Sequence, residues 1–145
     1  MYLLLSLSQV DALGYLIKLH GDSFMPFFDA SIAPSFAPYL QPNAAPGLQA
    51  VAVCLVDDAL EFGGASGQKY LGNLLPTLLG NFLSEHGMLA QSCVYGVARA
   101  CCCAVPSDAV RTNASAILAG FYAVLTAVNS AEDDEDEVRV QCCCL

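Results

Sequence analysis

The segment from Pro46 to Gly64, PGLQAVAVCLVDDALEFGG, constrains the fold of this chain more than any other. Proline is tolerated in the first turn of a helix and a glycine pair can end one, so the segment carries both boundaries of a helix. Its stretch VAVCLV alone would suit a β-strand, but these flanks favour a helix. Apolar residues recur every three or four positions, as on a wide buried face: Leu48, Val51, Leu55, Ala59 and Phe62.

Two adjacent carboxylates, Asp57 and Asp58, interrupt this apolar helix. Burial of an unpaired charge is costly, so we expect at least one of them to lie at an edge of the fold or to face a basic partner. Neighbouring side chains on a helix point about 100° apart, which is unlike the geometry of a catalytic pair of carboxylates. The pair therefore indicates binding or structure, and not acid-base chemistry.

The composition predicts a folded domain with a sizeable core. The chain has 145 residues, of which 56% are hydrophobic and 13% charged. Its formal charge is -9, but six of the 14 acidic residues lie in the run Glu132 to Glu137, EDDEDE. The body of the chain is therefore only mildly acidic. With five basic residues in all, the composition argues against nucleic acid as a partner, because phosphate binding needs clustered lysine and arginine.

The cysteines and the termini favour a reducing compartment. Two of the eight cysteines are single, and the other six form two triplets of consecutive residues, a pattern that does not indicate a disulfide framework. The cysteines are Cys54, Cys93, Cys101 to Cys103 and Cys142 to Cys144. No CxxC pair occurs and no histidine stands near a triplet, so we expect no metal site. The start, MYLLLSL, lacks the basic region of a secretory signal and is expected to be helical. The apolar run Ala114 to Val128 is shorter than the roughly 20 residues that span a bilayer, and predicts a buried helix.

Further helices are expected on both sides of the central one. The predicted ranges are Leu7 to Leu19, Ser23 to Leu40, Lys69 to Leu83, Leu89 to Cys103 and Asp108 to Val128. Val10, Leu13 and Ile17 should face inward on the first of them, which Gly21 should end. Asp22 or Ser23 should cap the second, and Pro34 and Pro38 should kink or split it. Gly63 to Gly67 is expected to be a short flexible link.

Bulky, proline-bearing helices alternate with smoother ones along the chain. Pro26 and Pro76 are 50 residues apart, and Cys54 and Cys93 are 39 apart. These spacings bracket the period of helical-hairpin repeats, which bury their apolar faces only by stacking. We therefore predict an all-α fold, an α-solenoid of HEAT-type antiparallel helix hairpins with two to three repeats. A plain helical bundle is the alternative. Residues 1–130 are expected to form the solenoid, and residues 131–145 an acidic, cysteine-rich, disordered tail.

Four stretches together resemble the later HEAT repeats of the importin-beta (karyopherin-beta) superfamily, most closely the importin beta-3 class. They are Met25 to Phe28 (MPFF), Cys54 to Glu61 (CLVDDALE), Lys69 to Pro76 (KYLGNLLP) and Gln91 to Ala98 (QSCVYGVA). The likeness covers about Gln9 to Ala100. It implies an armadillo-like helical fragment of a nuclear import receptor that works in cytoplasm and nucleus.

The resemblance also implies partners, namely cargo proteins, the GTP-bound form of the small GTPase Ran and the Phe-Gly repeats of nucleoporins. Asp57, Asp58 and Glu61 would form an acidic patch for cargo or Ran. The competing interpretation is structural, with Asp57 or Asp58 paired to a basic residue such as Arg99 one repeat later.

No hydroxyl, histidine and carboxylate converge in a recognisable catalytic motif, and no glycine-rich phosphate loop occurs, so the sequence predicts neither an enzyme nor a cofactor. Two other functions stay open. One is a generic HEAT-repeat scaffold for protein complexes. The other is a small membrane-associated bundle, prenylated at Cys142 in the terminal CCCL. Under the import-receptor hypothesis, we expect the protein to have no membrane as a partner.

Overall fold

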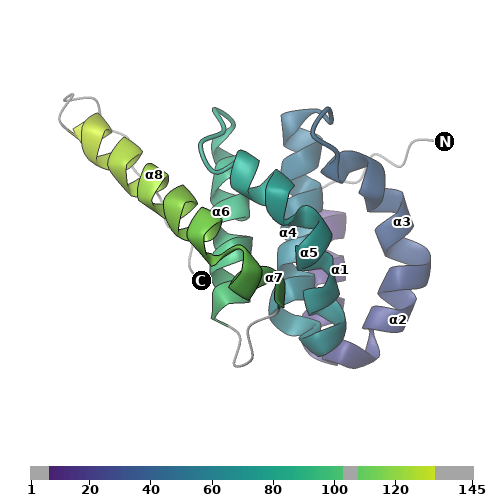
Figure 1. Cartoon of the computed structure of the whole chain (residues 1–145). Helices are drawn as coiled ribbons and strands as arrows, with labels where there is room; N and C mark the ends of the chain where they lie inside the picture. Colours follow the sequence, from purple (N-terminus) through teal and green to yellow (C-terminus); the bar gives the residue numbers. More distant parts are fainter. Residues whose placement is uncertain (1–6, 103–107, 133–145) are drawn as a thin grey trace.

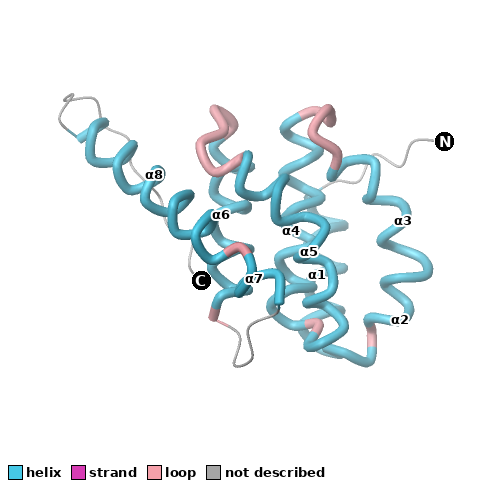
Figure 2. Tube along the Cα trace, viewed as in Figure 1, coloured by secondary structure: helices cyan, strands magenta, loops and turns pink. Residues whose placement is uncertain are grey.

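The computed structural model describes residues 7–102 and 108–132, and every regular element within these two ranges is helical (Figures 1 and 2). The longer helices are α1 (Leu7–His20), α4 (Pro46–Phe62), α5 (Gly64–Gly80), α6 (Gly87–Cys101) and α8 (Ala114–Glu132). The shorter ones are α2 (Met25–Phe27), α3 (Ala33–Phe36) and α7 (Asp108–Thr112). The expected helix at residues 1–6 and most of the expected tail, residues 133–145, lie outside the described ranges.

The helices form two layers that alternate along the chain. Helices α1, α4 and α6 lie side by side in one layer, with α4 in contact with both neighbours; we call this the first layer (Figure 1). The segment α2 to α3, helix α5 and helices α7 and α8 form the second layer, in which α5 packs against both α4 and α6. First-layer helices end at residues 20, 62 and 101, a period of about 40. The chain is therefore an all-α solenoid of HEAT-type antiparallel helix hairpins, as predicted.

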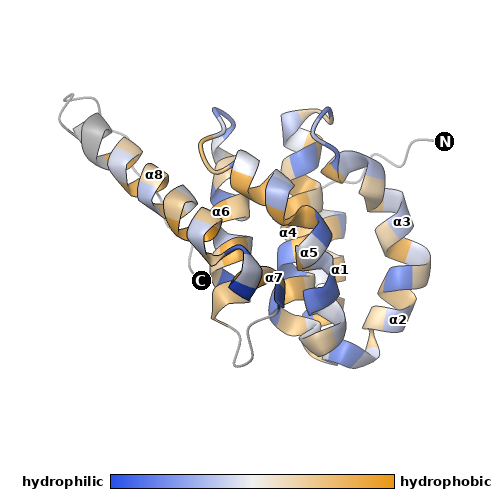
Figure 3. Cartoon of the chain, in the orientation of Figure 1, coloured by the Kyte–Doolittle hydropathy of each residue, from blue (hydrophilic) through white to orange (hydrophobic). Residues whose placement is uncertain are grey.

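Helix α4 is the centre of the fold because it contributes to two hydrophobic clusters. Val53 and Leu60 join the cluster built with α5 and α6, whereas Leu55 and Ala59 join the one built with α1 and the α2 to α3 segment. The single buried face predicted for α4 is thus too narrow, because neighbouring helices cover α4 on several sides. Leu48, predicted to be buried, is 42% exposed. Figure 3 shows how apolar residues gather where the helices meet.

The proline-rich segment is divided as predicted. Helices α2 and α3 are separated by a π-helical stretch, Phe28–Ile32, and a 3-10 turn, Ala37–Leu40, follows them. Pro34 and Pro38 each lie within the first two residues of a new stretch, where the absent N–H breaks no helical hydrogen bond. The chain can therefore curve through this segment and still cover α1 and α4.

Three sequence predictions in the second layer were wrong in detail. Residues 64–67 of the expected link are the first turn of α5, because Gly64 turns the chain at a φ of +58° and the next helix starts at once. The last helix is split at Asn113, between α7 and α8. Its apolar run is buried on one side only, since Ile117 is 3% exposed and Leu118 is 69% exposed.

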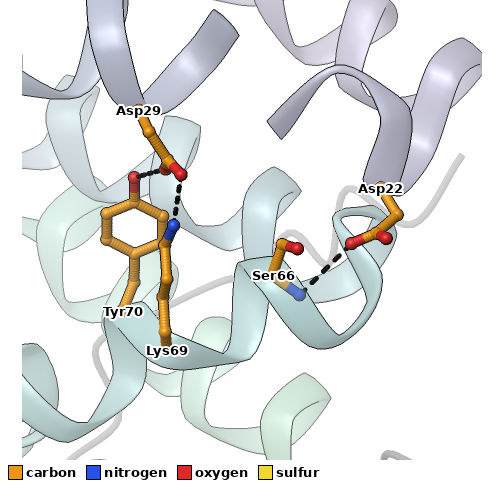
Figure 4. A network of polar contacts seen from close by, with 5 residues as sticks. All are labelled: Asp22, Asp29, Ser66, Lys69 and Tyr70. Carbon is orange, nitrogen blue, oxygen red and sulfur yellow. Dashed lines mark hydrogen bonds and ion pairs between the residues drawn. The ribbon is translucent and has the colours of Figure 1, made fainter. Parts of the chain in front are cut away.

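The expected cap at Asp22 or Ser23 takes another form. The Ser23 hydroxyl donates to the carbonyl oxygen of His20 at 2.6 Å. Asp22 instead accepts, through Oδ1, a hydrogen bond of 3.3 Å from the backbone N–H of Ser66 in the first turn of α5 (Figure 4). A carboxylate at this position satisfies a free helix donor and favours the positive end of the helix dipole. Asp22 thus caps a helix that begins 42 residues later in the chain.

Candidate functional site

Asp57 lies inside the protein, between α4 and α6. Its side chain is 5% exposed, and its Oδ1 atom has no hydrogen-bond partner. The carboxyl group reaches α6 at Gly96, where an added Cβ would lie 1.9 Å from Asp57 Oδ1. Burial, followed by the negative charges of Asp58 and Glu61, raises the pKa of Asp57 well above its ordinary value. Burial at this position therefore favours the protonated form of the Asp57 carboxyl group.

This position corrects one part of the predicted acidic patch. Asp57 does not face solvent, so it cannot contact cargo or a GTPase on an exposed surface. The expectation was that at least one of the two aspartates lies at an edge of the fold or faces a basic partner, and Asp58, half-buried and near Lys18, meets it. Asp57 is the buried member of the pair. A carboxyl group that keeps its proton carries no charge, and the cost of burying it falls accordingly.

Asp58, the next residue, points to the other neighbour of α4. A Cβ on Gly14 of α1 would lie 2.2 Å from Asp58 Oδ2, so this carboxyl group packs over a glycine as Asp57 does. Partial burial, then repulsion by Glu61 and Asp11, raises the pKa of Asp58 to about 6, while Lys18 acts in the opposite direction. Asp58 is half-buried and is charged at neutral pH.

Glu61, the third residue of the predicted patch, is already paired. Its Oε1 lies 2.6 Å from Nη2 of Arg99, and its Oε2 accepts a hydrogen bond of 2.5 Å from the Tyr95 hydroxyl. That hydrogen bond, with partial burial, raises the pKa of Tyr95 to about 12. The structural interpretation named Arg99 correctly but the wrong acid, because the ion pair joins α6 to Glu61.

The first layer therefore presents a different acidic surface from the predicted one. Asp58 is its centre, and Asp11 on α1 adds a second, exposed carboxylate that the sequence analysis missed. We call Asp11, Asp58 and Glu61 the acidic stripe. Asp11 could have been found from the solenoid prediction itself, since stacked repeats bring successive first-layer helices side by side.

A second polar network joins two elements of the second layer and is structural in character. The carboxylate of Asp29, in the π-helical stretch, receives an ion pair from Lys69 and a hydrogen bond from the Tyr70 hydroxyl (Figure 4). Burial alone would raise the pKa of Asp29, but these two partners lower it overall. The network fixes the position of the proline-rich segment on α5.

Two thiols of the first layer, those of Cys54 and Cys93, are poor nucleophiles. Cys54 Sγ lies 3.1 Å from the Ser92 hydroxyl, and burial raises the pKa of Cys54. Burial, followed by the charge of Asp57, raises the pKa of Cys93 to about 12. Within residues 7–102 and 108–132, no three histidine, cysteine or acidic side chains converge as a metal site. The predicted prenylation residue, Cys142, lies outside the part of the chain that the structure describes.

Comparison with known proteins gave no further assignment. No family model, no curated protein and no solved structure matches this chain. Among the described residues, no helix is both long and apolar enough to cross a membrane.

Proposed function

We propose that this chain is a protein-binding module, a fragment of a nuclear transport receptor of the importin-beta type. The proposal is supported by the fold class, by the resemblance of four stretches to that superfamily, and above all by the acidic stripe. Basic import signals and basic GTPase surfaces are partners that such a stripe suits. Cargo, GTP-bound Ran and nucleoporin Phe-Gly repeats are the proposed partners, and nucleus and cytoplasm the proposed locations.

The electrostatics of Asp58 carry the argument. Burial raises the pKa of Asp58 most, and repulsion by Glu61 and Asp11 raises it further, so negative charges lie close together on this surface. A lysine or arginine from a partner would relieve this repulsion, which gives a basic peptide a favourable interaction that an uncharged one lacks. Glu61 adds to the acidic stripe from a fixed position, because Arg99 and Tyr95 hold its carboxylate.

Fluorescence anisotropy with a lysine-rich and arginine-rich import-signal peptide tests this proposal. The native chain should bind the peptide, and Asp58→Asn should weaken binding about fivefold, the effect of roughly 1 kcal/mol. Asp108→Asn is the matched control, because Asp108 is an exposed acid on α7 that already pairs with Arg111. Equal binding by the native chain and Asp58→Asn would refute the role of the stripe.

Retention of the chain on GTP-loaded Ran and on Phe-Gly repeats distinguishes a transport receptor from a generic HEAT-repeat scaffold. A transport receptor should retain both, and GDP-loaded Ran should be retained less. A chain that binds the basic peptide but neither Ran nor Phe-Gly repeats would instead be a generic HEAT-repeat scaffold. An isoprenoid on the intact protein, measured by mass spectrometry, would favour the membrane-associated alternative.

A further inference from the structure

The contact between α4 and α6, which we call the α4–α6 seam, buries an acidic side chain among apolar ones. Val53 of α4 and Cys93 and Val97 of α6 are fully buried in one hydrophobic cluster. Asp57 follows Val53 by one helical turn on α4 and is 5% exposed. The seam is therefore mainly apolar, but it contains a group that can gain or lose a proton.

The Asp57 carboxyl group is packed against the backbone of α6. Its Oδ1 atom is buried and accepts no hydrogen bond, and a Cβ on Gly96 would lie 1.9 Å from that atom. Because even one added methyl group does not fit there, a counter-ion between Asp57 and α6 would have to displace α6. The closed seam thus has room for the carboxyl group alone.

The groups around Asp57 bring more negative than positive charge. On α4 they are a thiol and two acids, and on α6 a thiol, a phenol and a guanidinium: Cys54, Asp58 and Glu61, and Cys93, Tyr95 and Arg99. The guanidinium of Arg99 is already paired with Glu61, one turn from Asp57. The other basic residues of the described ranges lie on other elements, namely Lys18 on α1, Lys69 on α5 and Arg111 on α7.

The two protonation states of Asp57 make different demands on the seam. The neutral carboxyl group is tolerated at a dry contact, whereas a carboxylate there lacks both a counter-ion for itself and a donor for Oδ1. Water could supply those donors only if α6 moved away from Gly96's present position. A closed seam and an ionised Asp57 therefore disfavour each other, and the raised pKa of Asp57 expresses the same coupling.

Few polar contacts would have to break for the seam to open around Asp57. Cys54 contacts the Ser92 hydroxyl, and Glu61 holds Arg99 and Tyr95. The side chain of Arg99 is 42% exposed and Tyr95 is 43% exposed, so water can replace these contacts at little cost. Helix α6 is also held by α5, on the other layer, which can retain it while the seam opens.

We propose that the α4–α6 seam is a proton-controlled joint, closed while Asp57 carries its proton and opened locally when Asp57 loses it. Helix α6 then separates from α4 around Gly96, water reaches the carboxylate, and the buried Cys93 becomes accessible. The contact of α6 with α5 persists, so the opening is local and is not global unfolding. This joint concerns the conformation of the solenoid and does not depend on the proposed function.

Labelling of Cys93 with a small pyridyl disulfide reagent, followed in the full chain by peptide mass spectrometry, tests this inference. The rate at each pH is divided by the rate of the same thiol in the urea-unfolded chain, so that the ionisation of the thiol itself cancels. The open seam binds fewer protons than the closed one. The corrected rate should therefore rise by up to about tenfold per pH unit above the ordinary pKa of 3.8, and level off at the raised pKa of Asp57.

Two neighbouring substitutions provide the comparison. Asp57→Asn cannot ionise, so the corrected labelling of Cys93 should no longer depend on pH. Asp58→Asn is the matched control and should keep the rise, because Asp58 also has a raised pKa but packs over Gly14 of α1. Circular dichroism should show native helix content for both variants.

Three results would overturn the inference. One is a corrected labelling rate of the native chain that does not change with pH. Another is an equal rise in Asp57→Asn. The third is a rate that increases with low concentrations of urea as steeply as global unfolding does, since a local opening exposes little surface and should respond weakly.

Discussion

Replacement of Gly96 by alanine tests the packing of α4 against α6 at its closest point. The added Cβ would lie 1.9 Å from Oδ1 and 2.9 Å from Cγ of Asp57. Atoms in ordinary contact are about 3.5 Å apart, so the helices or the side chain must move by about 1.5 Å. Asp57 has little room to move, because its side chain is buried in the same interface.

The magnitude follows from two opposing effects. Extra atoms in a well-packed interior cost about 1–3 kcal/mol. Alanine in place of glycine inside a helix contributes about 1 kcal/mol in the opposite direction. We therefore expect Gly96→Ala to lower the free energy of unfolding by up to about 2 kcal/mol, which lowers the Tm by up to about 8 °C for a chain of this size.

Urea unfolding followed by circular dichroism measures this change, with Gly72→Ala as the matched control. Gly72 lies within α5 and has no atom within 4 Å of an added Cβ, so its substitution should raise stability by up to about 1 kcal/mol. Removing the clashing carboxyl group should rescue the variant. In an Asp57→Ala background, Gly96→Ala should cost at least about 1 kcal/mol less than it does in the native chain.

The reasoning would be refuted if Gly96→Ala stabilised the protein as Gly72→Ala does. The same conclusion would follow if the cost of Gly96→Ala were unchanged when Asp57 is alanine. Either result would mean that the carboxyl group does not occupy the space over Gly96.

Two further predictions concern buried and paired carboxylates. Folding raises the pKa of Asp57 and Asp58 above the ordinary 3.8, so both residues contribute most to stability below pH 3.8. The contribution of Asp58 is lost as the pH rises through about 6, and that of Asp57 is lost as the pH rises through its own raised pKa. Asp57→Asn should therefore raise stability at neutral pH and flatten this decline in urea unfolding; a decline as steep as in the native chain would contradict the assignment. Asp29→Ala should lower the free energy of unfolding by about 1 kcal/mol by freeing its lysine and tyrosine partners, whereas Asp108→Ala, an exposed ion pair within one helix, should change it by less than about 0.5 kcal/mol. Equal effects in thermal unfolding would contradict the structural role of Asp29.

Much of the fold could be predicted from local rules. Pro46 and the glycine pair after Phe62 mark the ends of α4, and Gly21, at a φ of +55°, ends α1. Pro34 and Pro38 divide their segment because proline lacks a backbone donor. The roughly 40-residue spacing predicts stacked hairpins. Each of these features depends on residues close together in the chain.

The candidate site could be predicted only in part, because it depends on contacts between repeats. The rule that places aspartate outside assumes a charged group, whereas burial raises the pKa of Asp57 and favours its uncharged form. Gly14 and Gly96 make room for the two carboxyl groups from helices about 40 residues away in either direction. Asp22 caps a helix in the next repeat for the same kind of reason. Similarly, the apolar content of α8 predicts a buried helix, but it cannot tell which of its faces a neighbour covers.

The central claim is that first-layer helices stack side by side, with Asp58 over Gly14 and Asp57 over Gly96. Nuclear Overhauser effects between the glycine α-protons and the aspartate β-protons measure these two contacts directly in the full chain. We predict that both pairs give cross-peaks, which would place α1 and α6 on opposite sides of α4. Absence of both cross-peaks, with Gly14 and Gly96 instead in contact with each other's helix, would contradict the stacked arrangement.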